Sequence, residues 1–295
     1  MTTSLGLDHA LVAVRDIGAA RTLYMELGFA SRGFSQHPWG TSNTVFIFRD
    51  QLFEIVSIGD AGLLDSYETN GFRFGQHVLG YLAKGEGVAL TALNSTDAEA
   101  DAQQLASRGV AVTGTIDFGR DVTRSDGVPD RTSTRLKVLF NDRFPRLSLF
   151  ACQQFRRDLI EYPEWMDHPN GVWAIAGMTI LSTASDSADI AEWLSRVHDA
   201  PPVRDGNRIL VKTAKGRWSI VDGSGFRDLH GKIGGPVAPQ GDAFIAGIDL
   251  ATPRPDWVAS RAEKLGLTTI WQDGILILPD AARLGGVWLR FGAFE

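Results

Sequence analysis

Two ionisable side chains lie within apolar, strand-like stretches near the start of the chain. His9 belongs to the stretch L-D-H-A-L-V-A-V, and Glu54 belongs to L-F-E-I-V. A buried carboxylate or imidazole without a partner is costly, so two such groups on one curved sheet are expected to meet. Together they could supply ligands to a metal ion or act as an acid–base pair. The structural alternative is a histidine bonded to its strand neighbours and a glutamate on a solvated strand face.

The elements that would position these residues recur along the chain. Residues 7–14 predict a strand, residues 16–27 predict a helix that Gly28 ends, and residues 45–48 and 52–58 predict a hairpin. The same order of elements starts again near residues 88, 174 and 243. The sequence therefore predicts four βαβββ modules.

Such a module leaves one apolar sheet face uncovered, and two modules side by side can curl into a cup that encloses a cavity. Four modules predict an α+β fold with two tandem cups, one in residues 1–158 and one in residues 172–295. The segment between them is polar and aromatic, contains Pro163, Pro169 and Gly171, and lacks glycine–serine runs. We therefore expect it to be a packed connector rather than a loose linker.

Composition excludes several classes of function. The 295-residue chain has 44% hydrophobic residues and a net charge of -6, which favours a packed core and argues against nucleic acid as a partner. No apolar stretch approaches the roughly 18 residues that span a bilayer, and a signal peptide is not expected, because Asp8 and His9 interrupt the first apolar run. Cys152 is the only cysteine, so a reducing, cytoplasmic location is expected, with this thiol packed in the core.

Three short motifs of the first module form a set: L-D-H at Leu7–His9, H-P-x-G-T-x-N at His37–Asn43, and L-F-E-I at Leu52–Ile55. With the tandem βαβββ modules, they resemble the glyoxalase-like branch of the vicinal oxygen chelate superfamily. The connector from Phe150 to Gly171 is also similar to bacterial members of this branch. The superfamily includes glyoxalase I, extradiol dioxygenases, methylmalonyl-CoA epimerase, and fosfomycin and bleomycin resistance proteins.

In this superfamily, four inward positions hold a divalent metal, one on the first strand and one on the last strand of each paired module. The resemblance places His9 and Glu54 at two of these positions and implies that both are metal ligands. In the second module, the corresponding positions fall at Ala89 or Leu90 and within Cys152–Gln154, where the usual ligands are missing. A divalent metal of unspecified identity and a metal-free site therefore both stay open.

The same comparison predicts a C-terminal cup without chemistry. Its corresponding positions fall at Gly177, near Ile245 and near Arg290, none of which offers a usual ligand. A triad of two histidines and one carboxylate, which would support Fe(II) oxygen chemistry, cannot be assembled from the paired modules. Extradiol cleavage is therefore disfavoured, despite the similar length and tandem layout.

Within the N-terminal cup, we predict His9, Glu54 and His37 as catalytic residues. His37 is included because it lies in a loop, where functional groups concentrate. Contacts with substrate are predicted for Thr41, Asn43, Arg73, His77, Gln153 and Gln154. The structural alternatives are a turn-capping His37, backbone bonds for the loop residues, and a solvated surface for Arg73 and His77. Gln153 and Gln154 lie on opposite strand faces, so one of them should face the cup.

Arg120, Arg124 and Arg131 lie in a second loop, which could cover the cup and pair with an acidic substrate, or simply be solvated. We expect an enzyme that binds a small, carbonyl-bearing or oxygenated substrate and transfers a proton, as isomerases and lyases do, with enolate stabilisation in the N-terminal cup. The alternative is sequestration of a small molecule, as in resistance proteins. Further alternatives are an extradiol-type dioxygenase and a metal-free enzyme. A homodimer is also expected, without nucleic-acid or membrane partners.

Overall fold

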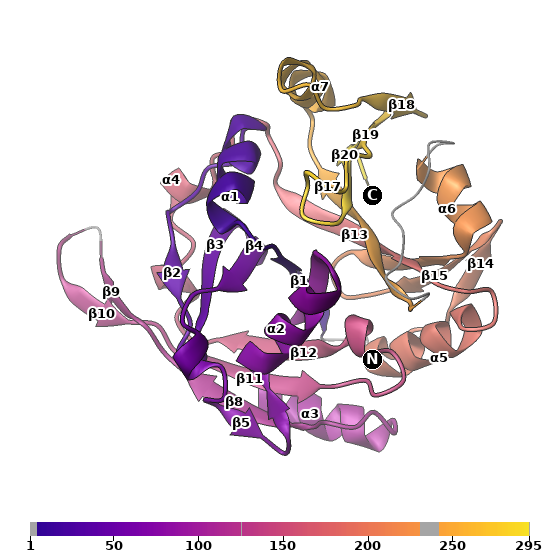
Figure 1. The fold of residues 1–295 in the computed structure, drawn as a ribbon. Helices are drawn as coiled ribbons and strands as arrows, with labels where there is room; N and C mark the ends of the chain where they lie inside the picture. Colours follow the sequence, from indigo (N-terminus) through magenta and orange to yellow (C-terminus); the bar gives the residue numbers. More distant parts are fainter. Residues whose placement is uncertain (1–4, 125, 231–241, 295) are drawn as a thin grey trace.

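Two curled, eight-stranded sheets dominate the computed structural model, which describes residues 5–124, 126–230 and 242–294 (Figure 1). The first sheet has the order β2 (Ser35–Gln36), β3 (Thr41–Phe48), β4 (Gln51–Ile58), β1 (Gly6–Ala13), β7 (Gly87–Asn94), β12 (Leu149–Gln154), β11 (Thr134–Leu139) and β8 (Gly114–Phe118). The second has the order β14 (Val203–Asp205), β15 (Arg208–Lys212), β16 (Arg217–Val221), β13 (Ala174–Leu181), β17 (Phe244–Ala251), β20 (Trp288–Gly292), β19 (Ile275–Leu278) and β18 (Ile270–Gln272). The predicted α+β fold of tandem cups is confirmed, whereas the exact domain limits stay predictions.

Seven α-helices accompany the sheets within the described residues: α1 (Ile17–Glu26), α2 (Phe74–Lys84), α3 (Ala98–Ser107), α4 (Pro163–Met166), α5 (Ser187–His198), α6 (Gly223–His230) and α7 (Pro255–Lys264). Two small ribbons pair β5 (Glu68–Thr69) with β6 (Phe72–Arg73), and β9 (Asp121–Thr123) with β10 (Pro129–Arg131). The first helices of the two N-terminal modules have aspartate caps, because Asp16 accepts from Ala19 N at 2.9 Å and Asp97 accepts from Ala100 N at 3.1 Å.

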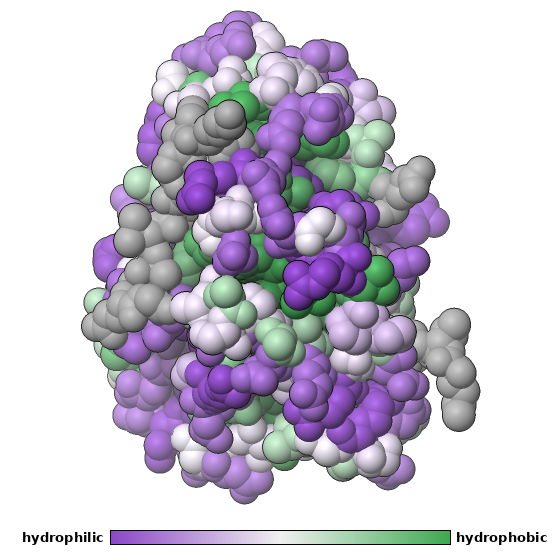
Figure 2. Space-filling view, turned by 90° about the vertical axis from the view of Figure 1, so that its right-hand side faces the viewer, coloured by the Kyte–Doolittle hydropathy of each residue, from purple (hydrophilic) through white to green (hydrophobic). Residues whose placement is uncertain are grey.

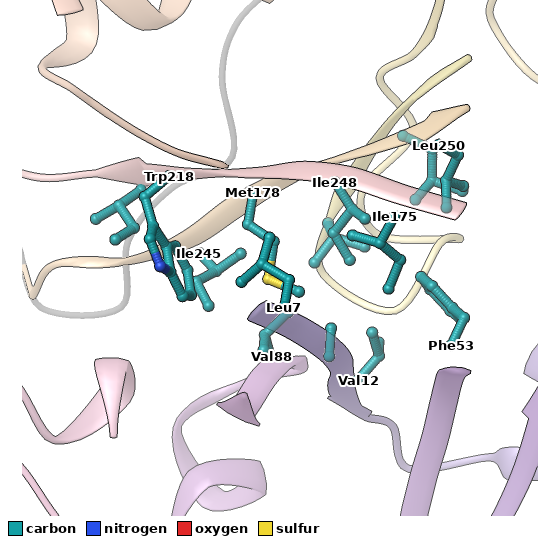
Figure 3. Packing of buried hydrophobic residues seen from close by; sticks show 14 of the residues in the cluster. Leu7, Val12, Phe53, Val88, Ile175, Met178, Trp218, Ile245, Ile248 and Leu250 are labelled. Carbon is teal, nitrogen blue, oxygen red and sulfur yellow. The ribbon is translucent and has the colours of Figure 1, made fainter. Parts of the chain in front are cut away.

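The two sheets share one apolar core between them. Figure 3 shows Leu7 and Val12 of β1 on one side and Ile175 and Met178 of β13 on the other, and all four side chains are buried. Because successive strand residues alternate between faces, this packing uses one face of each sheet and leaves the opposite, inner faces for the cups. The two sheets therefore pack against each other through the faces opposite to the cups.

A buried glutamine also links the two sheets. Gln51 Nε2 donates to Leu7 O at 2.9 Å and to Ile175 O at 3.0 Å, and Gln51 Oε1 accepts from Ile175 N at 3.0 Å. One side chain thus satisfies three backbone groups at the junction, where water is excluded.

The inner face of the first sheet is partly covered by α2. Phe74, Val78 and Tyr81 of this helix pack with Leu11 and Ala13 of β1 in a second apolar cluster. Side chains of α2 therefore fill part of this cup. The cavities that remain are lined by residues of β3, β4 and the segment after β8.

Side chains of the second sheet and of α6 fill part of the second cup. Arg290 and Asp249 form a buried ion pair with Nε–Oδ1 and Nη2–Oδ2 distances of 2.8 and 2.9 Å. His230 stacks on Phe226 of α6 with ring centroids 4.2 Å apart, and a Cβ added at Gly247 would lie 2.6 Å from the His230 ring. These groups use each other as partners.

The face that carries α5, α6 and β14 is mostly hydrophilic, with hydrophobic residues visible in small areas between polar ones (Figure 2). Among the described residues, no helix has both the length and the apolar character that crossing a membrane requires.

We predict that Gln51→Leu destabilises the chain by about 1–3 kcal/mol, because it leaves buried backbone groups at the junction without partners. Chemical denaturation measures the free energy of unfolding. Gln103→Leu, on the exposed face of α3, is the control and should change it by less than about 0.5 kcal/mol. Equal stabilities of the two variants would show that Gln51 does not join the sheets.

Candidate active site

His9 lies on the inner face of β1 beside an irregularity in that strand. Leu7 pairs with Leu93 of β7, and His9 pairs with Ala92, so Asp8 is an extra residue in β1. Such a β-bulge re-aims the side chains next to it. Asp8 and His9 are both buried, and His9 Nδ1 lies 3.2 Å from Asp8 Oδ1. The bulge thus supplies the buried imidazole with a carboxylate.

Glu54 reaches the same point from β4, which runs parallel to β1. Its Oε2 atom lies 3.3 Å from His9 Nε2, and its Oε1 atom accepts a hydrogen bond from Asn43 Nδ2 at 2.6 Å. The structure therefore brings together the two ionisable residues that stand out in the sequence, and adds Asn43 from β3.

His37 approaches Glu54 from the turn between β2 and β3. Gly40 in this turn has a φ of 81°, and a Cβ there would lie 2.2 Å from a backbone oxygen of the loop after β4. The turn therefore requires glycine. Thr41 Oγ1 lies 2.9 Å from His37 Nδ1, and the Trp39 ring stacks on the imidazole at 4.6 Å. These contacts hold His37 Nε2 at 3.7 Å from Glu54 Oε1.

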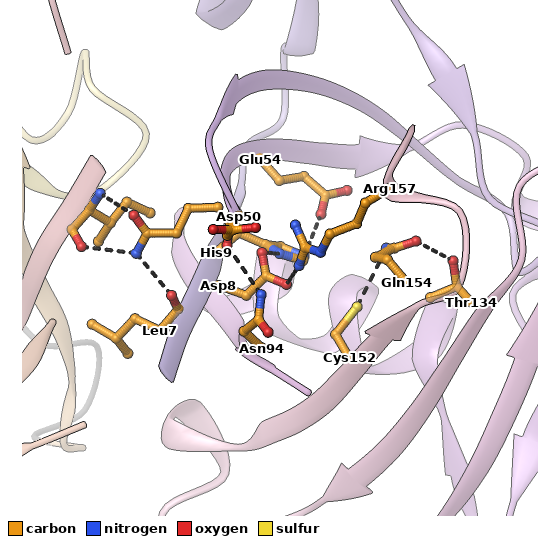
Figure 4. Close-up of polar contacts among 12 residues, drawn as sticks. Leu7, Asp8, His9, Asp50, Glu54, Asn94, Thr134, Cys152, Gln154 and Arg157 are labelled. Carbon is orange, nitrogen blue, oxygen red and sulfur yellow. Dashed lines mark hydrogen bonds and ion pairs between the residues drawn. The ribbon is translucent and has the colours of Figure 1, made fainter. Parts of the chain in front are cut away.

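Arg157, in the 3-10 turn η3 (Arg157–Leu159) after β12, pairs with the far side of Asp8. Its Nη2 donates to Asp8 Oδ2 at 2.8 Å, and its Nη1 donates to Glu161 Oε1 at 2.9 Å. Charges of alternating sign therefore follow one another from Glu161 to Glu54, and Figure 4 shows Arg157, Asp8, His9 and Glu54 gathered in one cluster. Such pairing is what makes buried charges tolerable.

These neighbours set the protonation of the site. Burial lowers the pKa of His9, but Asp8 and Glu54 together raise it to about 9, so this imidazole is positively charged at neutral pH. Burial raises the pKa of Glu54, but its contacts with His9, His37 and Asn43 lower it to about 2. Burial lowers the pKa of His37 to about 3, and the attraction of Glu54 does not compensate, so His37 is neutral.

A small cavity of about 40 Å³ adjoins His9, His37 and Glu54, and its other walls include Phe150 and Leu136 of the second module. An outer cavity of about 440 Å³ lies next to it under the β9–β10 ribbon. The two cavities share lining residues, namely Asn43, Val45, Leu52, Arg120 and Gln154. A molecule in the outer cavity can therefore present one end to the charged cluster.

The predicted substrate contacts divide into two groups. Asn43 and Gln154 line both cavities, and Thr41 acts through its bond to His37. Gln153 faces away from the cup, where it accepts from Ala98 N at 3.0 Å and donates to Thr96 O at 2.7 Å at the start of α3. The strand register thus makes Gln154, and not Gln153, the inward glutamine.

Arg73 and His77 also lie away from the cavities. Arg73 Nε is 3.7 Å from Asp65 Oδ1 at the surface, and His77 Nε2 is 2.9 Å from Ala89 O beneath α2. Helix α2 begins at Phe74, and of these three residues only Phe74 lines the inner cavity. Arg73 and His77 therefore line neither cavity, and their contact with a substrate stays a prediction that this placement does not support.

Sequence reasoning did not single out Asp8, and it gave Arg157 no role. Asp8 looks like an ordinary polar residue at a strand start, and Arg157 lies 149 positions away from it. Arg120 was only one of three arginines in a loop, yet among these three it alone lines the inner cavity. A carboxylate next to an apolar-strand histidine is the one local signal that could have drawn attention to Asp8.

The superfamily metal site can be tested on this geometry. His9 and Leu90 are each the fourth residue of an eight-residue strand, β1 and β7. The residue two positions beyond His9 pairs with Glu54, and the residue two positions beyond Leu90 pairs with Phe150. Leu90 and Phe150 therefore occupy the other two ligand positions, and neither can bind a metal.

His37 could offer a third ligand beside His9 and Glu54, but it does not complete a metal site in this arrangement. His9 and Asn43 already engage the two carboxylate oxygens of Glu54, and the Arg120 cation lines the same cavity. Within residues 5–124, 126–230 and 242–294, no group of three or more His, Cys, Asp or Glu side chains is arranged to hold a metal ion. The residues present do not fit the superfamily metal centre.

A family model described as "Glyoxalase-like domain" matches residues 7–198. The chain belongs to this family, and the resemblance noted in its motifs is confirmed. No curated protein matches the chain in sequence.

Solved structures with the same fold show low sequence identity. A hypothetical protein from Staphylococcus aureus has a TM-score of 0.67 and 14% identity, covering 97% of this chain and 98% of that one. A mutant 4-hydroxymandelate synthase from Streptomyces coelicolor has a TM-score of 0.55 and 11% identity, covering 100% and 95%. A fusion of a xylose isomerase-like TIM barrel with 4-hydroxyphenylpyruvate dioxygenase has a TM-score of 0.56 and 13% identity, covering 99% of this chain but 49% of that one. At these identities the likeness shows the fold alone.

We predict that Asp8→Asn lowers the pKa of His9, because it removes the carboxylate that favours the imidazolium most. The stability that charged His9 contributes is fully present below pH about 6.5 and is lost as the pH rises through about 9. NMR titration of ¹⁵N-labelled histidine, assigned with a His9→Gln variant, measures the pKa. Asp97→Asn, which keeps a helix cap far from His9, should leave it unchanged. An unchanged His9 titration in Asp8→Asn would refute this account of the cluster.

Proposed function

We propose that this glyoxalase-like domain protein is an enzyme that binds a small carbonyl compound in the N-terminal cup and moves a proton at the carbon next to the carbonyl. The observation that supports this proposal is the buried cluster in which His9 is clamped between Asp8 and Glu54 at the wall of a cavity. A cavity that only retained an apolar compound would gain nothing from buried charges, which are costly to desolvate.

Each member of the cluster has a distinct role in this proposal. Charged His9 donates a hydrogen bond to the carbonyl oxygen and stabilises the negative charge that develops as the enolate forms. Glu54 takes the proton from the neighbouring carbon and can return it to the same or the adjacent carbon. Asp8 orients the His9 ring and stabilises its positive charge from the Nδ1 side, while Asn43 orients the Glu54 carboxylate.

The low pKa of Glu54 would make it a weak base, but substrate binding changes its surroundings. Its hydrogen bond with His9 is a main cause of that low pKa. A carbonyl oxygen that takes this hydrogen bond removes the cause, and burial then raises the pKa of Glu54 toward the range of an effective base. Substrate binding itself would thus activate the carboxylate.

Sequestration of a small molecule is the second candidate function. It is favoured by the apolar walls that the second module contributes, with Leu136 and Phe150 facing His9 across the inner cavity. The two functions differ in one respect, since a sequestering protein leaves its ligand chemically unchanged. The homodimer and the cytoplasmic location stay predictions.

We predict that the protein accelerates exchange of the proton next to the carbonyl with solvent deuterium, followed by NMR in D₂O. The probes are pyruvate, 2-oxobutyrate, dihydroxyacetone and dihydroxyacetone phosphate. Glu54→Gln should slow the exchange by about 10²-fold or more, because a positioned base contributes that much. Glu99→Gln, which alters an exposed glutamate paired with Lys137, is the control and should keep the full rate.

One result would contradict the proposal, and another would change the site on which it rests. Binding of a probe without any exchange would favour sequestration. One metal ion per chain by elemental analysis, lost in Glu54→Gln and His37→Gln, would replace the metal-free site with a metal centre.

A further inference from the structure

Arg120 is a cation at the cavity without an ion-pair partner among the described residues. It follows β8, is partly buried, and makes one side-chain hydrogen bond, from Nη1 to Asn43 Oδ1 at 3.4 Å. Burial lowers its pKa, which means that its surroundings disfavour the charge, although Glu54 attracts it. A guanidinium carries five N–H donors, so most of its donor capacity is unused here.

A second arginine lies on the rim of the same outer cavity. Arg32 is exposed, and its guanidinium lies 3.7 Å from the centroid of the Trp165 ring, which holds it in place. Although the residue is exposed overall, partial desolvation of its guanidinium against the protein surface and the repulsion of Arg120 both lower the pKa of Arg32. Two like charges held beside one cavity are unfavourable until an anion joins them.

The other arginines of this region are already neutralised. Arg131, which also lines the outer cavity, pairs with Asp121 and bonds to Gly119 O. Arg124 pairs with Asp126 at 3.0 Å. The unpaired positive charge is therefore concentrated at Arg120 and Arg32.

Asn43 connects this charge to the proton-transfer cluster. Its Oδ1 faces Arg120 and its Nδ2 donates to Glu54, so the amide lies between the two. Arg120 and Asn43 also line both cavities. Arg120, Glu54 and His9 line the same inner cavity. A small ligand can therefore bind Arg120 with one group and place a neighbouring group next to Glu54 and His9.

We propose that Arg120, with Arg32 at the rim, binds an anionic group of the substrate, so that the substrate is a small carbonyl compound bearing a carboxylate or a phosphate. The carbonyl end of this substrate rests on the proposed function. The anion site is inferred independently, from the positions of Arg120 and Arg32 at the outer cavity. Arginine suits both anions, because its planar donors match their oxygens in pairs. The outer cavity, at about 440 Å³, is of the size that small ligands occupy.

The test measures binding without chemistry. Oxalate, inorganic phosphate and the neutral oxalate analogue oxamide are titrated into the wild-type protein by isothermal calorimetry. We expect oxalate or phosphate to bind and oxamide to bind at least about tenfold more weakly. The tighter of the two anions identifies the substrate group as a carboxylate or a phosphate.

Arg120→Gln should weaken anion binding by about tenfold or more, the loss expected for one charge-assisted hydrogen bond. Arg32→Gln, at an exposed position that should not disturb folding, should weaken it by a smaller factor. Arg124→Gln removes an equally charged residue of the same loop that is already paired, and should leave binding unchanged. Equal binding of oxalate and oxamide, or full anion affinity in both Arg120→Gln and Arg32→Gln, would overturn the proposal.

The same variants separate this inference from the proposed function. Glu54→Gln should bind the anions at least as tightly as the wild type, because it removes a negative charge beside Arg120. Arginine-dependent anion binding without proton exchange would leave the anion site intact and refute the enzyme. Exchange of dihydroxyacetone that is unaffected by Arg120→Gln, with no exchange of the anionic probes, would keep the enzyme and refute the anion site.

Discussion

The site depends on one constraint: a positive charge on His9 can exist inside the sheet only while carboxylates stand on both sides of it. Glu54 and Asp8 meet this need, at 3.3 and 3.2 Å from the two ring nitrogens. Each carboxylate then requires its own partner, which Asn43 and Arg157 supply. The strand bulge, strand β3 and the segment after β12 are thus linked to a single imidazole, because a charge left unpaired in this interior would be strongly destabilising.

The second cup shows that the backbone pattern does not require this chemistry. Its β13 strand has the same irregularity as β1, since Ile175 pairs with Leu250 and Gly177 pairs with Asp249, which leaves Ala176 as the extra residue. Ala176 and Gly177 therefore stand where the first cup has Asp8 and His9. A side chain at Gly177 would lie 3.2 Å from Asp249 Oδ2, so glycine makes room for the ion pair that Asp249 forms with Arg290. The same bulge positions a cluster of charged side chains in one cup and permits close packing in the other.

The parts of the structure that were predictable from sequence are those that local patterns determine. The modules follow from helix and strand periodicity, and His9 and Glu54 stand out because ionisable groups are rare in apolar strands. The face of a residue near a strand end depends on register, which explains why Gln154 and not Gln153 lines the cavities. Contacts such as Arg157 with Asp8 join distant segments and have no local signal, so they emerged only from the fold.

Asn43 lies between Arg120, the proposed anion-binding residue, and Glu54, the proposed base, on one cavity wall. In the free protein, Arg120 attracts the charge of Glu54 and so favours its ionised, weakly basic form. An anion bound to Arg120 would cancel this attraction and add a negative charge near Glu54. The negative charge of the anion thus raises the pKa of Glu54, in the same direction as the loss of its hydrogen bond with His9 to the substrate carbonyl. In the proposed mechanism, the two ends of one substrate would therefore act together on the same carboxylate, and a ligand lacking either end would leave Glu54 a poorer base.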